Sequence, residues 1–198
     1  MIWFTRVAIF GALYSFGAVA LLHWLCRDYD VIMQPLSYYA VGEFGWVMTT
    51  VFLASATSMF ALARAIVLIA PQRFSIGRAL PNIVGACLLI AGIFPTDITT
   101  NNTPETLIGL IHVIASYTFA PCLVAATLLL SRDFDRDARH PIFALAVSVW
   151  ASFILLSLAN IFDWQIGGIG QRVFLLLAMM WVIAMAMRLK DPTGFQNP

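Results

Sequence analysis

Long uninterrupted apolar segments dominate the pattern of this chain. Six of them stand out, and each is close to the ~20 residues that a helix needs to cross ~30 Å of hydrocarbon. They cover residues 3–25, 44–70, 79–94, 106–130, 142–162 and 173–187. The third is short, and Pro95 marks its end. The pattern predicts an all-α integral membrane protein, a bundle of six transmembrane helices that forms one domain over residues 1–198.

Two segment ends leave alternatives open. The second helix begins earlier if Ser37 acts as its N-cap, and the added length then requires a tilted helix or a turn in the membrane interface. The first segment, with Arg6 before its apolar stretch, has the outline of a secretory signal peptide. It runs on to Leu25 without a small-x-small cleavage site, so we expect a retained helix.

The distribution of basic residues predicts the orientation in the membrane. Nine Lys and Arg residues fall at the N-terminus, in or beside the second and fourth connections, and in the tail. The other connections carry two, Arg27 and Arg172. Because cytoplasmic loops are enriched in Lys and Arg, both termini are expected in the cytoplasm and the first, third and fifth connections outside. The expected location is the inner (plasma) membrane.

The amino-acid composition supports the prediction of a membrane protein and argues against several classes of function. Charged residues make up 11% of the chain, against about 25% in a soluble domain. The net charge is +1 and no basic stripe occurs, so nucleic acid is not an expected partner. Three cysteines predict no disulfide framework, and no Cys/His spacing fits a zinc site. We therefore expect neither a metal nor a cofactor; membrane lipids are the expected partners.

The fourth apolar segment carries a histidine, which is costly inside a bilayer and usually faces the bundle interior. His112 lies about 10 Å below the outer end of this helix at 1.5 Å per residue. Glu105, Gly109 and Ser116 share its face, and the small residues permit close helix approach. Two interpretations remain: a neutral imidazole bonded to a neighbouring backbone or hydroxyl group, or a functional residue.

Asp97 and Arg172 are both expected at the outer ends of their transmembrane helices, close to the depth of His112. Asp97 is either an ordinary turn cap or the carboxylate that orients the His112 imidazole. Arg172 follows the glycine-rich stretch 167–170, expected to be flexible. It either forms an ion pair with Asp97 or Asp163, or holds an anionic head group. We expect Asp97, His112 and Arg172 to lie around one outward-opening cavity.

Several short motifs in order resemble a family of bacterial and archaeal membrane proteins known as domain of unknown function 998. They are Pro35-Leu36-Ser37, the stretch Gly92-Ile93-Phe94-Pro95-Thr96-Asp97, Ile111-His112-x-x-Ala115-Ser116, and Gly170-Gln171-Arg172 followed by Trp181. The resemblance spans nearly the whole chain. It implies the six-helix fold and suggests Ser37, Asp97, His112 and Arg172 as the polar positions of the family. It implies no particular reaction.

Four functions follow as hypotheses. The first is an outward-facing site for a lipid head group or small amphiphile, formed by Ser37, Glu43, Asp97, His112, Ser116, Asp163 and Arg172. The second is an enzyme that uses Asp97 and His112 as an acid–base pair on a lipid or isoprenoid ester. The third is a transport subunit, because size and topology are similar to the substrate-binding components of energy-coupled vitamin transporters, although their helix-packing signature is missing. The fourth, a haem protein with His23 and His112 as ligands, has too few histidines. We favour the binding hypothesis.

Overall fold

The fold is a bundle of long helices. The computed structural model describes residues 2–69, 76–99, 103–134 and 141–190, and within these residues it contains helices and no strand. The elements in chain order are α1 (Ile2–Leu25), the 3₁₀ helix η1 (Leu36–Ala40), α2 (Gly45–Ile69), α3 (Ile76–Ile93), α4 (Leu107–Phe134), α5 (Pro141–Ile161) and α6 (Gly167–Lys190). The six α-helices among the described residues are each long and apolar enough to cross a membrane. The predicted all-α, six-helix fold is confirmed, and the chain is a multi-pass membrane protein.

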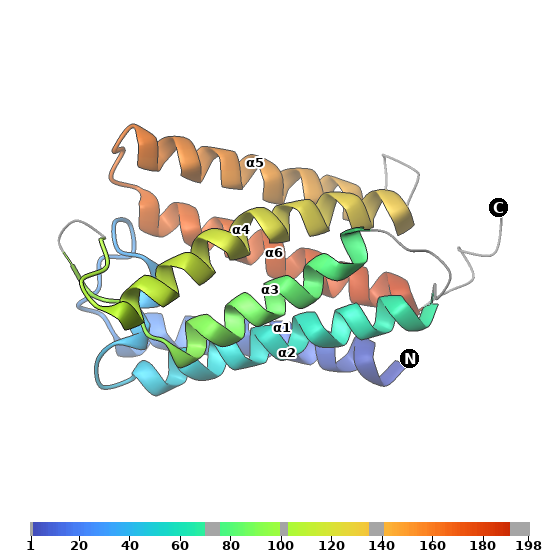
Figure 1. Ribbon diagram of the computed structural model, residues 1–198, viewed down its shortest axis with the longest axis horizontal. Helices are drawn as coiled ribbons and strands as arrows, with labels where there is room; N and C mark the ends of the chain where they lie inside the picture. The colour runs from blue at the N-terminus through green and yellow to red at the C-terminus, as the bar shows by residue number, and fades with distance from the viewer. Residues whose placement is uncertain (1, 70–75, 100–102, 135–140, 191–198) are drawn as a thin grey trace.

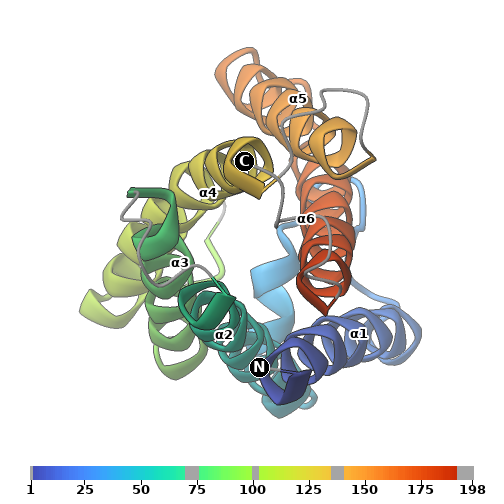
Figure 2. The same ribbon diagram turned by 90° about the vertical axis from the view of Figure 1, so that its right-hand side faces the viewer.

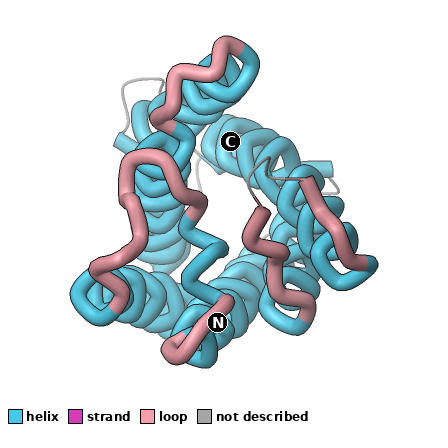
Figure 3. The backbone as a smooth tube through the Cα atoms, turned by 90° about the vertical axis from the view of Figure 1, so that its left-hand side faces the viewer, coloured by secondary structure: helices cyan, strands magenta, loops and turns pink. Residues whose placement is uncertain are grey.

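The helices lie side by side along the long axis of the molecule (Figure 1). Each packs against the next in the chain, and α6 returns to pack against α1, so the bundle is arranged in chain order around its axis (Figure 2). The start of α1 and the end of α6 lie at one end, which we call the terminal end. The other end, the site end, carries residues 26–44, 94–99 and 162–166 (Figure 3).

The two halves of the bundle are packed differently. The main hydrophobic core fills the half toward the terminal end with residues from all six helices, and includes the fully buried Trp181. The Trp181 indole N–H donates to the Ser131 hydroxyl at 2.8 Å. A second, smaller core at the site end joins α1, η1 and the start of α2. Among α3, α4, α5 and α6 the main core ends at Leu88, Leu123, Val149 and Phe174, and the space between these helices closer to the site end belongs to neither core.

Two helices begin at positions that differ from the expectation. Ser37 does not cap α2, because it lies inside η1, and α2 begins only at Gly45 after an extended Val41 and a Gly42 with φ of 103°. Residues 167–170, expected to be a flexible linker, form the first turn of α6. Gly168 allows this because the backbone of Gln34 passes against it, in space that a side chain would occupy.

The basic residues that predicted the orientation lie toward the terminal end wherever the structure describes them. They are Arg6, Arg64, Arg78, Arg132, Arg188 and Lys190. We therefore expect a reporter fused after Pro198 to be active in the cytoplasm and a reporter in the first connection, at Asp28, to be active outside. Activity of the first fusion on the outer side would reverse the orientation of the site end.

Candidate functional site

A cavity of about 1220 Å³ occupies the part of the site half that neither core fills. Its walls come from α2, α3, α4, α5 and α6, and residues 33–38 of the first connection close it at the site end. Small-molecule sites usually measure about 300–1,000 Å³ and combine an apolar lining with a few convergent polar groups. The cavity is therefore large enough for a ligand with both a polar part and a hydrocarbon part.

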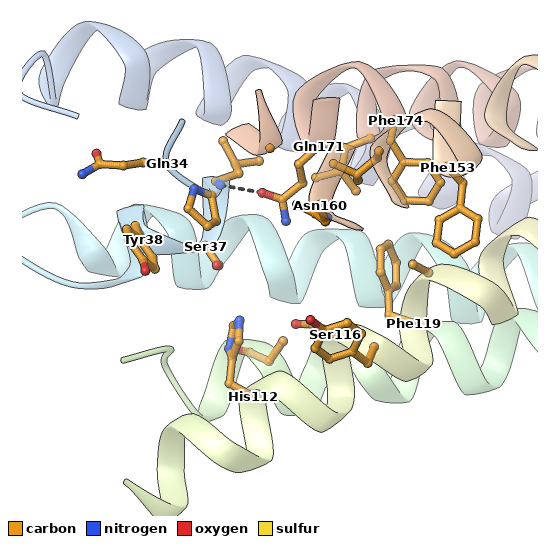
Figure 4. A pocket seen from close by; sticks show the side chains of 18 of the residues that line it. Gln34, Ser37, Tyr38, His112, Ser116, Phe119, Phe153, Asn160, Gln171 and Phe174 are labelled. Carbon is orange, nitrogen blue, oxygen red and sulfur yellow. Dashed lines mark hydrogen bonds between the residues drawn. The ribbon is translucent and has the colours of Figure 1, made fainter. Parts of the chain in front are cut away.

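Polar and apolar side chains separate along this cavity (Figure 4). Toward the site end the lining is polar and mostly uncharged, with Gln34, Ser37, Tyr38, His112, Ser116, Asn160 and Gln171. Deeper in the bundle it becomes aromatic and aliphatic, with Phe119, Phe153, Phe174, Leu175 and Met179. The lining thus has the polarity gradient of an amphiphile.

The cavity also reaches the side of the bundle between α4 and α5. Tyr117 of α4, 79% exposed, and the exposed Asn160 of α5 both line it. Before Pro121, α4 buries three residues, Gly109, His112 and Ala115, whereas beyond Pro121 it is well buried. Pro121 lacks the N–H that would bond the Tyr117 carbonyl, which weakens the helix at this point. Figure 1 shows α4 and α5 diverging toward the site end, and the exposed Tyr117 and Asn160 indicate that the cavity opens between these two helices.

His112 is held from α4 against the end of α3 and is 3% exposed. Its Nδ1 lies 2.8 Å from the Phe94 carbonyl oxygen and 3.2 Å from that of Ala91. The last carbonyls of a helix have no partner within the helix, so the imidazole satisfies groups that would otherwise lack a partner. Because a carbonyl can only accept, Nδ1 carries the proton, and in the neutral ring Nε2 is then an acceptor. No described residue donates to this Nε2.

Asp97 caps the start of α4. One carboxylate oxygen accepts the backbone N–H groups of Glu105 and Thr106, both at 2.8 Å, and the other accepts the Thr106 hydroxyl at 2.9 Å. The N–H of Thr106, with further help from its hydroxyl and from the N–H of Glu105, holds the pKa of Asp97 below its usual value despite partial burial. A side chain at Gly109 would collide with this carboxylate.

The structure thus decides between the two interpretations of Asp97. Its carboxylate makes helix-capping bonds and, among the described contacts, none to His112, whose Nδ1 is bonded to α3. Both residues border a small pocket of about 120 Å³ beside the main cavity. The expectation that Asp97 orients the imidazole is wrong, because the N-terminal N–H groups of α4 attract the carboxylate more strongly than a neutral ring does.

We expect Asp97→Ala to lower the thermal stability of the purified protein at neutral pH, because α4 loses its cap. The pKa of Asp97 is lowered on folding from 3.8. The capping contribution is therefore fully present above pH ~3.8 and is lost as pH falls through the lower folded-state value. Unfolding curves at several pH values measure this. Asp28→Ala, which removes an exposed carboxylate of the first connection, is the control and should behave like the parent.

Arg172 joins three segments at the site end. Its Nε donates to Nε2 of His23 at 2.8 Å, and its Nη1 donates to the carbonyl oxygens of Gln34 and Gly168, each at 2.9 Å. The guanidinium also lies over the Tyr39 ring, 5.6 Å from its centre. These contacts connect α1, the first connection and α6. Arg172 therefore has a structural role, with neutral acceptors in place of the expected carboxylates.

The expectation that Arg172 shares a cavity with His112 is corrected by the same contacts. The neighbouring residue, Gln171, lines the cavity instead, and its side-chain oxygen accepts the Leu36 N–H at 2.6 Å. Successive residues of a helix point about 100° apart, so Gln171 and Arg172 face different sides of α6. One face of α6 thus serves the cavity and the adjacent face secures the first connection.

The other candidate residues are distributed between the cavity and the surface. Ser37 and Ser116 line the cavity. Asp163 lies at its exposed rim, where it accepts a hydrogen bond from the Gln165 amide at 2.6 Å. Glu43 is exposed in the connection before α2 and lines neither pocket.

Three uncharged polar residues that line the cavity were not predicted from the sequence. They are Gln34, Tyr38 and Gln171, which are uncharged at neutral pH and therefore lack the high cost of burial that marks a charged group inside a bilayer. The one signal in the sequence was the position of Gln171 in the motif Gly170-Gln171-Arg172. The three phenylalanines of the deep part gave no signal, because phenylalanine is common throughout this apolar chain.

Comparison with known proteins identifies a family. The model of the family described as "Protein of unknown function (DUF998)" matches residues 9–188, which is nearly the whole chain. No curated protein and no solved structure matches significantly. The family match therefore agrees with the resemblance seen in the motifs, and the function must be inferred from the cavity itself.

Proposed function

The chain belongs to the DUF998 family of membrane proteins, and we propose that it binds a lipid head group or small amphiphile in the cavity of its site half. The observation that carries this proposal is the change in lining along one cavity, from uncharged polar side chains to phenylalanines. The head group lies among Ser37, His112, Ser116 and Gln171. The hydrocarbon part extends toward Phe119, Phe153 and Phe174.

The opening between α4 and α5 supports a ligand that comes from the membrane. A hydrocarbon chain that enters through water loses its favourable environment, whereas one that enters sideways stays in contact with apolar surface. Tyr117 and Asn160 stand at this opening and offer hydrogen-bonding groups to a head group that passes between them. If the site end faces outward, as the basic residues predict, the ligand comes from the outer leaflet.

The contacts of Asp97 weaken the alternative of a membrane-embedded enzyme. An acid–base pair needs two groups within hydrogen-bond reach of the same substrate atoms. Asp97 is engaged with the N-terminus of α4, and Nδ1 of His112 with the end of α3. A transport role would use the same cavity, but no observation favours it over binding alone.

Photolabelling tests the proposal. A monoacylglycerol with a diazirine in its acyl chain is incubated with the purified protein, irradiated, and the labelled peptides are identified by mass spectrometry. We expect labels near Phe119, Phe153 and Phe174, with competition by excess unlabelled compound. Labels confined to outward-facing positions such as Phe10 and Phe16, both more than half exposed, would reject the proposal.

A further inference from the structure

We infer that the bound head group is uncharged and donates a hydrogen bond, from a hydroxyl group, to Nε2 of His112. This inference rests on the proposed binding function and narrows its ligand to alcohols, glycerides and similar hydroxyl-bearing amphiphiles. It excludes phosphates, fatty-acid carboxylates and amines as the preferred ligands.

The charges around the cavity do not suit an ionic head group. None of the described residues that line the two pockets is Lys or Arg. Arg172 follows the lining residue Gln171 but lines neither pocket, and its guanidinium already donates to His23, Gln34 and Gly168. An ion removed from water without an opposite charge loses more solvation energy than neutral dipoles return. A phosphate or carboxylate would therefore bind here at a substantial cost.

A cationic head group meets a similar difficulty. Asp97 accepts three hydrogen bonds from the start of α4. Asp163 stands at the exposed rim, where water screens it, and already accepts from Gln165. A cation in the polar part of the cavity would thus lack an available carboxylate among the described lining residues.

His112 supplies the specific contact. Its Nδ1 proton is engaged by the carbonyl oxygens at the end of α3, which fixes the ring and its tautomer. Nε2 is then a well-oriented acceptor on a side chain that is almost fully buried and lines the cavity. Figure 4 shows the ring projecting from α4 toward Ser37 of η1. Nε2 is not one of the fully enclosed polar atoms that lack a partner, so it is open to the cavity, where a ligand hydroxyl can reach it and donate to it.

The surrounding side chains suit a hydroxyl-bearing group. Ser37 and Ser116 also line this part of the cavity, and no described residue hydrogen-bonds their hydroxyl groups. A serine hydroxyl both donates and accepts, as does a ligand hydroxyl. Gln171 contributes its amide N–H groups, because its oxygen is occupied by Leu36. Together these groups complement a head group that bears hydroxyl groups.

A series of three probes with the same oleoyl chain tests the charge of the head group. Monooleoylglycerol is neutral with two hydroxyls, oleate is anionic and oleylamine is cationic. Dissociation constants are measured by competition against the photolabel, with the protein in neutral nanodiscs so that the membrane favours no charge. We expect monooleoylglycerol to bind at least about tenfold more tightly than either charged probe.

Two substitutions test the acceptor. His112→Asn keeps a donor near the position of Nδ1, so the bond to α3 can persist, but it removes the acceptor at Nε2. We expect it to raise the Kd for monooleoylglycerol about three- to tenfold, the effect of one neutral hydrogen bond, without changing the Kd for oleate. His112→Gln reaches as far as Nε2 and should recover part of the affinity.

The outcomes separate this inference from the proposed function. Suppose that the three probes bind equally tightly and that a bulky residue inside the cavity weakens the binding of each. The proposed function would then stand, but the inference of a neutral head group would be overturned. Tightest binding of oleate would show that the cavity favours an anionic head group and would likewise overturn it. Binding of no probe, or binding insensitive to filling the cavity, would reject both. The probe series uses the unaltered protein, so it decides the question of charge even if His112→Asn does not fold.

Discussion

Replacing Ala120 with tryptophan is expected to raise the Kd of the bound amphiphile at least about tenfold. Ala120 lines the cavity eight residues after His112, on the same face of α4. An indole at this position extends toward the phenylalanines of the deep part and takes the place of the hydrocarbon chain. Ala120 packs against the edge of the main core but is itself only partly buried, so the fold should persist with a loss of stability of about 1–3 kcal/mol.

The neighbouring variant Thr118→Trp is the matched control. Thr118 is exposed on α4, and its hydroxyl bonds the Ile114 carbonyl of its own helix. Two residues along a helix correspond to about 200° of rotation, so this indole points away from the cavity and into lipid. Competition binding in nanodiscs should give a Kd within about twofold of the parent. Equal effects of the two variants would mean that the ligand binds elsewhere on the protein.

Replacing Gly168 with alanine is expected to destabilise the protein by about 1–3 kcal/mol. The added methyl carbon would lie 2.5 Å from the carbonyl oxygen of Gln34 and 2.9 Å from that of Ile32. Both are backbone atoms, so the first connection must move. In a helix, alanine alone would gain up to about 1 kcal/mol over glycine. We expect the steric clash to outweigh this gain in helix propensity, because moving the first connection also weakens the hydrogen bonds between it and α6.

Three hydrogen bonds depend directly on the position of the first connection. They are Ile169 N–H to Ile32 O at 3.1 Å, Arg172 Nη1 to Gln34 O at 2.9 Å, and Leu36 N–H to Gln171 Oε1 at 2.6 Å. Because the same segment brings Ser37 to the cavity, we expect weaker binding of monooleoylglycerol together with lower stability. If Gly168→Ala bound monooleoylglycerol as tightly as the parent protein, the position of the first connection would not affect the binding site.

Thermal unfolding followed by circular dichroism measures the stability effect, because most of the described residues are helical. Gly17→Ala is the matched control. A methyl group on Gly17 meets no atom within 4 Å, so the variant should be unchanged or slightly more stable than the parent. If Gly168→Ala behaved like Gly17→Ala, the close contact between α6 and the first connection would be refuted.

Parts of the candidate site could be read from the sequence because they are costly to bury. His112 stood out as an imidazole within an apolar segment, and both its burial and its bond to neighbouring backbone were among the expectations. Asp97 stood out beside Pro95, and its role as a cap was one of the two alternatives. The partners of Arg172 could not be read, because the side of α6 that meets α1 depends on how the helices are rotated in the bundle.

The sequence by itself determined that this chain crosses the membrane. It also determined the number of transmembrane helices and, approximately, where each of them begins and ends. Apolar length decides those properties, since the bilayer requires a continuous helix of fixed span. The tertiary structure alone decided which residues meet. In lipid nearly every face of a helix is apolar, so hydrophobicity does not specify which face points inward, and small residues and hydrogen bonds determine the packing instead. The cavity results from this packing, because its polar end is formed by residues 33–38, α4 and α6 together. The spacing of residues within one segment cannot show that these three segments meet.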